Sequence, residues 1–143
     1  MKTRTFNLWM FALCLLAFSF QSCSDDEIKP EPFELMEWKS DVNLTLQGYN
    51  TYQVDVPAQG GTMVFTCINC DGVSEIVCWE DDKIVETDKP LTTDYTRDWG
   101  SIKVQNNIMT VTVLPEASKK FKEIRLSISY SVFSISDFVF NLK

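Results

Sequence analysis

The strongest constraint on the fold is the alternation of apolar and polar residues in short runs separated by turn-forming residues. Met109, Val111 and Val113 alternate with threonines, and two asparagines precede the run. A period of two places every second side chain on one face of a β-strand, and asparagine pairs are typical of hairpin turns. Similar runs continue from residue 42 to residue 142, without a helical period over ten positions. About seven to nine short strands predict an all-β, antiparallel β-sandwich, with a small barrel as the alternative.

Residues 1–22 predict a cleaved export signal instead of a part of the fold. Lys2 and Arg4 precede an apolar run from Leu8 to Phe20. The run is shorter than the ~20 residues that cross a bilayer. A basic start, a short apolar block and a polar continuation are the order of a secretory signal peptide.

The end of that segment, Ser19-Phe20-Gln21-Ser22-Cys23, resembles a lipobox, the lipoprotein signal in which small residues precede a cysteine that receives diacylglycerol. The resemblance implies cleavage before Cys23 and lipid attachment to its thiol. Acyl chains gain about 0.8 kcal/mol per buried methylene, so several chains together hold a protein on a membrane.

The residues that follow Cys23 predict a tether and then one folded body. Residues 23–40 contain two prolines and many acidic residues, which favour an extended linker. Leu35, Met36 and Trp38 are the residues of this stretch that could begin the body by packing on its edge. The β-sandwich itself is expected over residues 41–143.

The composition argues against several classes of function. The chain has no histidine, which removes Ser-His-Asp and Cys-His catalysis and imidazole metal ligands. Loss of residues 1–22 removes Lys2 and Arg4 and no acid, so the net charge falls from −7 to −9, which disfavours nucleic-acid partners. A thin sandwich has little room for a cleft between two catalytic carboxylates. No catalytic residue, metal site or cofactor is therefore expected, and a small hydrolase is disfavoured.

Three cysteines remain after the proposed anchor: Cys67, Cys70 and Cys78. In an exported protein two of them can form a disulfide, and the spacing leaves the pairing open. Zinc is disfavoured because a structural site commonly needs four Cys or His ligands.

Four aromatic residues are candidates for ligand contact: Tyr49, Trp79, Tyr95 and Trp99. Exposed aromatic faces with polar neighbours can hold sugar rings, whereas buried ones would simply fill the core. Ser127, Ser129 and Ser131 share one face of a predicted strand. They indicate either a solvent face or a strand to which a partner could add its own.

Residues 54–66 resemble the opening of a BACON domain. Val54-Asp55-Val56 is an alternating strand, Pro57-Ala58-Gln59-Gly60-Gly61-Thr62 follows, and a second strand comes next. The resemblance covers roughly residues 42–142 and implies an immunoglobulin-like module common in surface proteins of Bacteroidota. Asp25-Asp26-Glu27 behind the anchor resemble the acidic tag that sends Bacteroidota lipoproteins to the cell surface, although the run could also be a plain solvated spacer.

Together these features predict a non-enzymatic lipoprotein of the outer membrane, held there through Cys23 and exposed on the surface or on the periplasmic face. Its partner would be a glycan or another envelope protein. The alternative is a purely structural spacer or subunit that has no ligand of its own.

Cys23→Ala is expected to release the protein from membranes because the acyl chains lose their attachment site. Fractionation of cells into membrane and soluble material measures this. A variant that stays in the membrane fraction would argue against a lipid anchor at this position.

Overall fold

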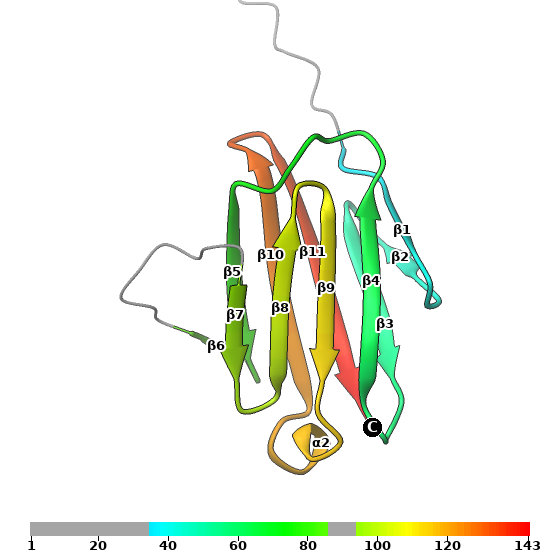
Figure 1. Ribbon diagram of the computed structural model, residues 1–143, viewed down its shortest axis with the longest axis vertical. Coiled ribbons are helices and arrows are strands. Elements are labelled where there is room, and N and C mark those ends of the chain that lie inside the picture. The colour runs from blue at the N-terminus through cyan, green and yellow to red at the C-terminus, as the bar shows by residue number, and fades with distance from the viewer. Residues whose placement is uncertain (1–34, 86–93) are drawn as a thin grey trace, which may run out of the picture. The chain divides into compact units, whose positions relative to one another are not determined.

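The computed structural model describes residues 35–85 and 94–143, which belong to one compact unit, Pro32–Lys143. The predicted signal peptide, Cys23 and the acidic run after it lie outside these residues. The described chain forms two stacked sheets (Figure 1). The first contains, in spatial order, β1 (Trp38–Ser40), β4 (Gly61–Cys67), β9 (Ile108–Val113), β8 (Gly100–Gln105) and β7 (Asp94–Arg97). The second contains β2 (Thr45–Gln47), β3 (Thr51–Val56), β11 (Ser134–Leu142), β10 (Glu123–Ser131), β5 (Glu75–Glu80) and β6 (Lys83–Ile84).

The strand order identifies the sandwich as immunoglobulin-like. β1-β4-β9-β8 corresponds to strands A, B, E and D, and β6-β5-β10-β11 corresponds to C′, C, F and G. The predicted fold class is therefore confirmed. Seven strands are six residues or longer, and the four short strands β1, β2, β6 and β7 lie at the sheet edges.

One strand pair differs from the antiparallel expectation, because β3 runs parallel to β11. Between these two strands the chain crosses to the other sheet and returns, so no tight turn forces opposite directions. A short helix, α2 (Ala117–Lys120), lies in the connection between β9 and β10.

The folded body begins before residue 41, inside the segment that was expected to be a tether. Met36 and Trp38 are buried in the core, and β1 pairs with β4 through Trp38 opposite Cys67. The proline-rich and acidic composition of the preceding residues obscures this short edge strand, whose burial depends on a partner strand far away in the sequence.

The centre of the core is a cluster of aromatic rings around Phe138. Trp38 and Phe65 meet its ring edge-on at 5.1 Å, and Tyr52 stacks on it at 5.3 Å. Phe140 also stacks alongside Phe138. Such ring pairs add about 0.5–1.5 kcal/mol each beyond their area burial. The cluster joins β1 and β4 of one sheet to β3 and β11 of the other.

Two hairpins show how local sequence sets the turns. Asn106-Asn107 connects β8 to β9 as predicted, with Asn106 at a φ of 55°. Asp81 and Asp82 connect β5 to β6, and both have positive φ, at 44° and 64°. Two-residue turns with positive φ match the twist of the flanking strands, and Asn and Asp tolerate this conformation better than most residues.

A buried polar network ties one end of the sandwich together. The indole nitrogen of Trp38 donates to the Ser136 hydroxyl at 3.0 Å, and this hydroxyl donates to the Asn50 side chain at 2.9 Å. The Asn50 amide nitrogen in turn donates to the carbonyl of Ile135. The network joins β1, the β2–β3 turn and the start of β11.

Gly60 is expected to be the less replaceable of two glycines with similar backbone angles. Gly60 and Gly48 have φ of +70° and +62°, but a Cβ at Gly60 would lie 2.3 Å from the Val113 carbonyl oxygen, whereas one at Gly48 meets nothing within 4 Å. Gly48→Ala should cost about 1 kcal/mol for its left-handed backbone. Gly60→Ala should cost about 1–3 kcal/mol more, the range of overpacking strain. Urea unfolding measures both, and equal losses would contradict the close approach of the β3–β4 turn to Val113.

Candidate functional site

The structure excludes Trp99 from the predicted ligand contacts. Trp99 is completely buried and belongs to the hydrophobic core. Its position just before β8 directs the ring inward, where a large apolar surface is removed from water. The alternation of apolar and polar residues does not predict whether a residue at the end of a strand faces the core or the solvent.

Tyr95 is half-buried and packs against the core from β7. Its hydroxyl lies beside the Cys78 thiol and has no oxygen or nitrogen hydrogen-bond partner among the described residues. Burial and the neighbouring thiol raise the pKa of Tyr95 to about 12. The polar end of this ring therefore faces inward and offers little to an external ligand.

Trp79 and Tyr49 both reach the surface, but in different parts of the sandwich. Trp79 is half-buried on the outer face of β5, where the guanidinium carbon of Arg125 lies 5.7 Å from its ring centroid. Tyr49 is 69% exposed in the turn between β2 and β3. The four predicted aromatics consequently do not form one surface for a sugar.

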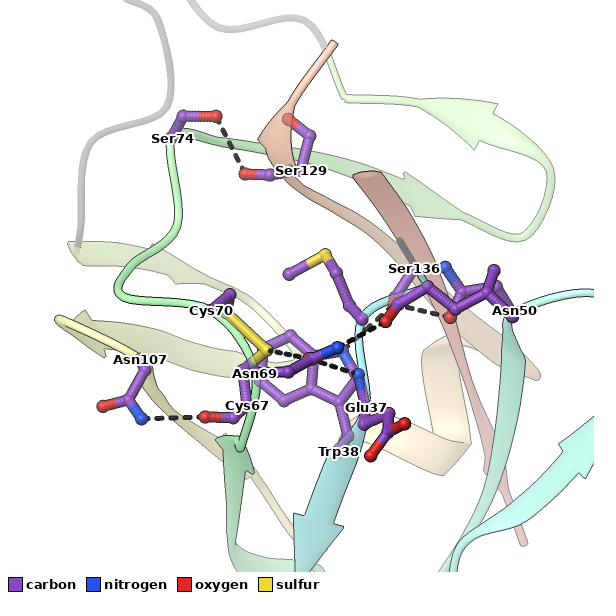
Figure 2. The surroundings of a disulfide bond; sticks show 12 residues. Glu37, Trp38, Asn50, Cys67, Asn69, Cys70, Ser74, Asn107, Ser129 and Ser136 are labelled. Carbon is purple, nitrogen blue, oxygen red and sulfur yellow. Dashed lines mark hydrogen bonds between the residues drawn. A yellow bond between two sulfur atoms is a disulfide. The ribbon is translucent and has the colours of Figure 1, made fainter. Parts of the chain in front are cut away.

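The cysteine pairing that the sequence left open is resolved as a disulfide between Cys67 and Cys70 (Figure 2). Cys78 is free and buried. The Cα atoms of the bonded pair are 5.7 Å apart. Asn69, between them, accepts from the Glu37 backbone at 2.8 Å and donates to the Leu35 carbonyl at 2.7 Å. The disulfide loop therefore holds the segment that leads into β1.

The serine-faced strand cannot accept a partner strand. β10 lies between β11 and β5 and pairs with both. Its backbone hydrogen bonds are already used, so the suggestion of strand addition at Ser127, Ser129 and Ser131 is wrong. The solvent-face interpretation of these serines remains.

A surface hollow that the sequence did not predict is named here the edge groove. It has a volume of about 460 Å³ and lies between the two sheets at their open edge. Its lining includes Glu80, Asp81, Lys83, Arg97, Lys120 and Phe121.

An ion pair across the two sheets forms the wall of the edge groove. Arg97 of β7 donates to both carboxylate oxygens of Glu80 of β5, at 3.0 and 3.3 Å. These hydrogen bonds to Glu80 are the main cause that raises the pKa of Arg97. The two parallel hydrogen bonds hold the guanidinium and the carboxylate in one plane, and this planar polar surface faces the groove.

Two further charged groups of the edge groove, Asp81 and Lys120, already have partners, whereas Lys83 does not have one among the described residues. The Asp81 carboxylate accepts from the backbone of Lys122 and Glu123, at 2.8 and 3.0 Å, and Lys120 pairs with Asp98 at 3.3 Å. Lys83 has no ion pair with any residue that the structure describes. Sequence analysis missed the site because Arg97 is far from Glu80 along the chain.

The one free thiol among the described residues is not suited to nucleophilic chemistry. Cys78, behind the groove, has a pKa raised to about 12, first by burial and then by the Glu80 carboxylate, so it stays protonated at neutral pH. Within residues 35–85 and 94–143, no group of three or more acidic or cysteine side chains is placed to hold a metal ion.

Comparisons with known proteins identify no relative. No family model and no curated protein matches the chain. An NMR structure of a protein from Bacteroides thetaiotaomicron is similar with a TM-score of 0.48 and 17% identity, over 77% of this chain and 89% of that one. The M1 domain of titin has a TM-score of 0.42 and 10% identity, over 75% and 95% of the two chains.

The twitchin kinase region of C. elegans is similar with a TM-score of 0.38 and 10% identity, over 74% of this chain and 16% of that one. At such identities the likeness concerns the fold alone. In the part of the chain that the structure describes, no helix has the length and apolar character needed to cross a bilayer.

Cys78 is expected to resist alkylation in the native Pro32–Lys143 unit. A shift of its pKa from 9.0 to about 12 lowers the thiolate fraction about a thousandfold at neutral pH, and burial blocks the reagent. Mass spectrometry after iodoacetamide treatment should show no adduct in buffer and one adduct in guanidinium chloride. A Cys78→Ala variant is the control, and rapid labelling of the native protein would contradict the buried position.

Proposed function

We propose that this chain is a non-enzymatic, lipid-anchored module of the cell envelope that binds a carbohydrate in the edge groove. The observation that carries the proposal is the position of the groove. Its lining includes Arg97 at the end of β7 and Lys120 of α2, and these elements end opposite to the end of the sandwich at which β1 begins (Figure 1).

The strand register supports this placement. β1 begins at Trp38 opposite Cys67, which is the last residue of β4. β4 begins at Gly61 opposite Val113, just before the α2 region, whose Lys120 lines the edge groove. A lipid on Cys23 would thus hold one end of the body near the membrane and present the edge groove to the surroundings.

The chemistry of the groove fits a sugar better than an apolar ligand. Sugar hydroxyls pair well with planar carboxylate and guanidinium groups, which Glu80 and Arg97 supply side by side. The Phe121 ring offers an apolar surface of the kind on which sugar C–H groups pack. Lys83 adds a cation that would favour an acidic sugar.

Two sequence features support a more specific assignment, namely membership in the BACON family and residence in the outer membrane. Residues 57–60 form the β3–β4 connection and Gly61 and Thr62 begin β4, with Gly60 at the positive φ that the motif's glycines allow. The acidic residues after Cys23 support a surface location, and the periplasmic face is the alternative.

A purely structural spacer is the second candidate function. It is favoured by the burial of Trp99 and the separation of Trp79 from Tyr49, which leave the sandwich without a shared aromatic platform. A spacer would need no ligand at the edge groove.

A glycan-array screen of Pro32–Lys143 tests the proposal, and Arg97→Gln should weaken binding at least about tenfold, or about 1.4 kcal/mol. The charged contact is lost while the neighbouring Glu80 is left unpaired. Lys39→Gln, an exposed cation on β1, is the matched control and should bind like the wild type.

The fragment starts at Pro32 because a later start would delete Met36 and β1. Thermal unfolding of each variant verifies that it is folded. Clean non-binding of the folded wild type would favour the spacer. If the protein instead captures an envelope protein and Arg97→Gln does not weaken that binding, the binding site lies outside the edge groove.

A further inference from the structure

The β10–β11 hairpin ends in an exposed apolar turn, here named the hairpin tip (Tyr130–Ile135). Val132 is 85% exposed and Phe133 is 63% exposed, and Tyr130 and Ile135 are partly exposed, at 43% and 44%. Ser131 pairs with Ser134, so Val132 and Phe133 are the two loop residues. Such positions are usually taken by Gly, Asn, Asp or Ser, whose conformations and hydrogen bonds suit a turn in water. The tip therefore exposes apolar surface to water, which is energetically unfavourable.

No charged residue occurs between Arg125 and Asp137. Transfer of the tip into a medium of low dielectric constant would therefore strip water from no ionised group. The Phe133 backbone nitrogen also donates to the Ser131 hydroxyl at 3.3 Å. This hydrogen bond lowers the free-energy cost of removing the backbone of the turn from water.

The hairpin tip is held firmly to the body. Asn50 contacts the start of β11 through its side chain, which donates to the Ile135 carbonyl, and through its carbonyl, which accepts from Asp137 at 3.0 Å. The same turn carries Tyr49, whose ring is well exposed. Tyrosine is favoured where one side is apolar and the other is wet, as at a membrane surface.

The tip lies beside the point where the chain joins the fold. Leu35, Tyr130 and Ser134 line one small hollow next to Cys70. Figure 1 shows the β10–β11 turn and the start of β1 at the same end of the sandwich. Eleven residues separate Cys23 from Leu35, and the chain between these two Cα atoms spans at most about 40 Å when extended. An anchor at Cys23 would keep this end within reach of the bilayer.

We propose that the hairpin tip, together with Tyr49, dips into the headgroup region of an uncharged bilayer and serves as a second membrane contact. This inference deepens the proposed function, because it rests on anchorage at Cys23 for its orientation. With two contacts at one end, the sandwich stands on the membrane and the edge groove points away from it. Neutral lipids are the fitting partner, since the acidic chain is repelled by anionic headgroups.

The test uses Pro32–Lys143, a compact unit with its own core, and vesicles of phosphatidylcholine and phosphatidylethanolamine. This fragment lacks Cys23, so its result is independent of lipid attachment, which fractionation of Cys23→Ala tests separately. Phe133→Trp should be quenched by brominated lipids above the wild-type background. Leu114→Trp, an exposed apolar position near α2, is the matched control and should not be quenched.

The double variant Val132→Ser, Phe133→Ser should reduce vesicle partitioning at least tenfold, whereas Leu114→Ser should leave it unchanged. Circular dichroism verifies that each variant is folded, and the Phe133→Trp reporter keeps the test valid if the double variant does not fold. Absence of quenching, equal quenching of both reporters, or binding seen only with anionic vesicles would overturn the proposal. A reporter signal that changes with protein concentration without lipid would instead assign the tip to self-association.

Discussion

The sandwich depends on the ring of Phe138, around which residues from both sheets pack. Trp38 and Phe65 approach it from the first sheet, and Tyr52 and Phe140 belong to the second. Because aromatic pairs prefer edge-on or offset contacts, this cluster specifies the spacing and direction of the two sheets more closely than aliphatic packing would. The burial of β1, and with it the start of the folded body, follows from the place of Trp38 in the cluster.

The two ends of the sandwich differ in chemistry because strands run lengthwise and their connections gather at the ends. At one end, the Trp38–Ser136–Asn50 network and the disulfide loop support an uncharged hairpin tip. At the other, the Asp81-Asp82 turn and α2 surround the Glu80–Arg97 pair. A closed core of apolar side chains separates them, and the buried Cys78 thiol has too high a pKa to be reactive. Both proposed interactions are therefore made by surfaces at the ends.

The long strands and the Asn106-Asn107 hairpin were predictable because their signals are local: every second residue is apolar and the turn residues tolerate positive φ. The edge strands β1 and β7 were not, since strands of three and four residues carry too few positions for a period. Trp99 was ambiguous for a related reason, as a residue beside a turn can face either way.

The sequence by itself determined the all-β class, the inward face of each long strand, the absence of imidazole chemistry and the acidic charge. Only the tertiary structure decided that Arg97 meets Glu80, that Cys67 bonds to Cys70, and that Tyr130 lies beside Leu35. The physical reason is the range of the interactions. Alternation reports how one strand divides its own side chains between core and water, whereas these contacts form only after the two sheets have stacked and their loops have been brought to common ends.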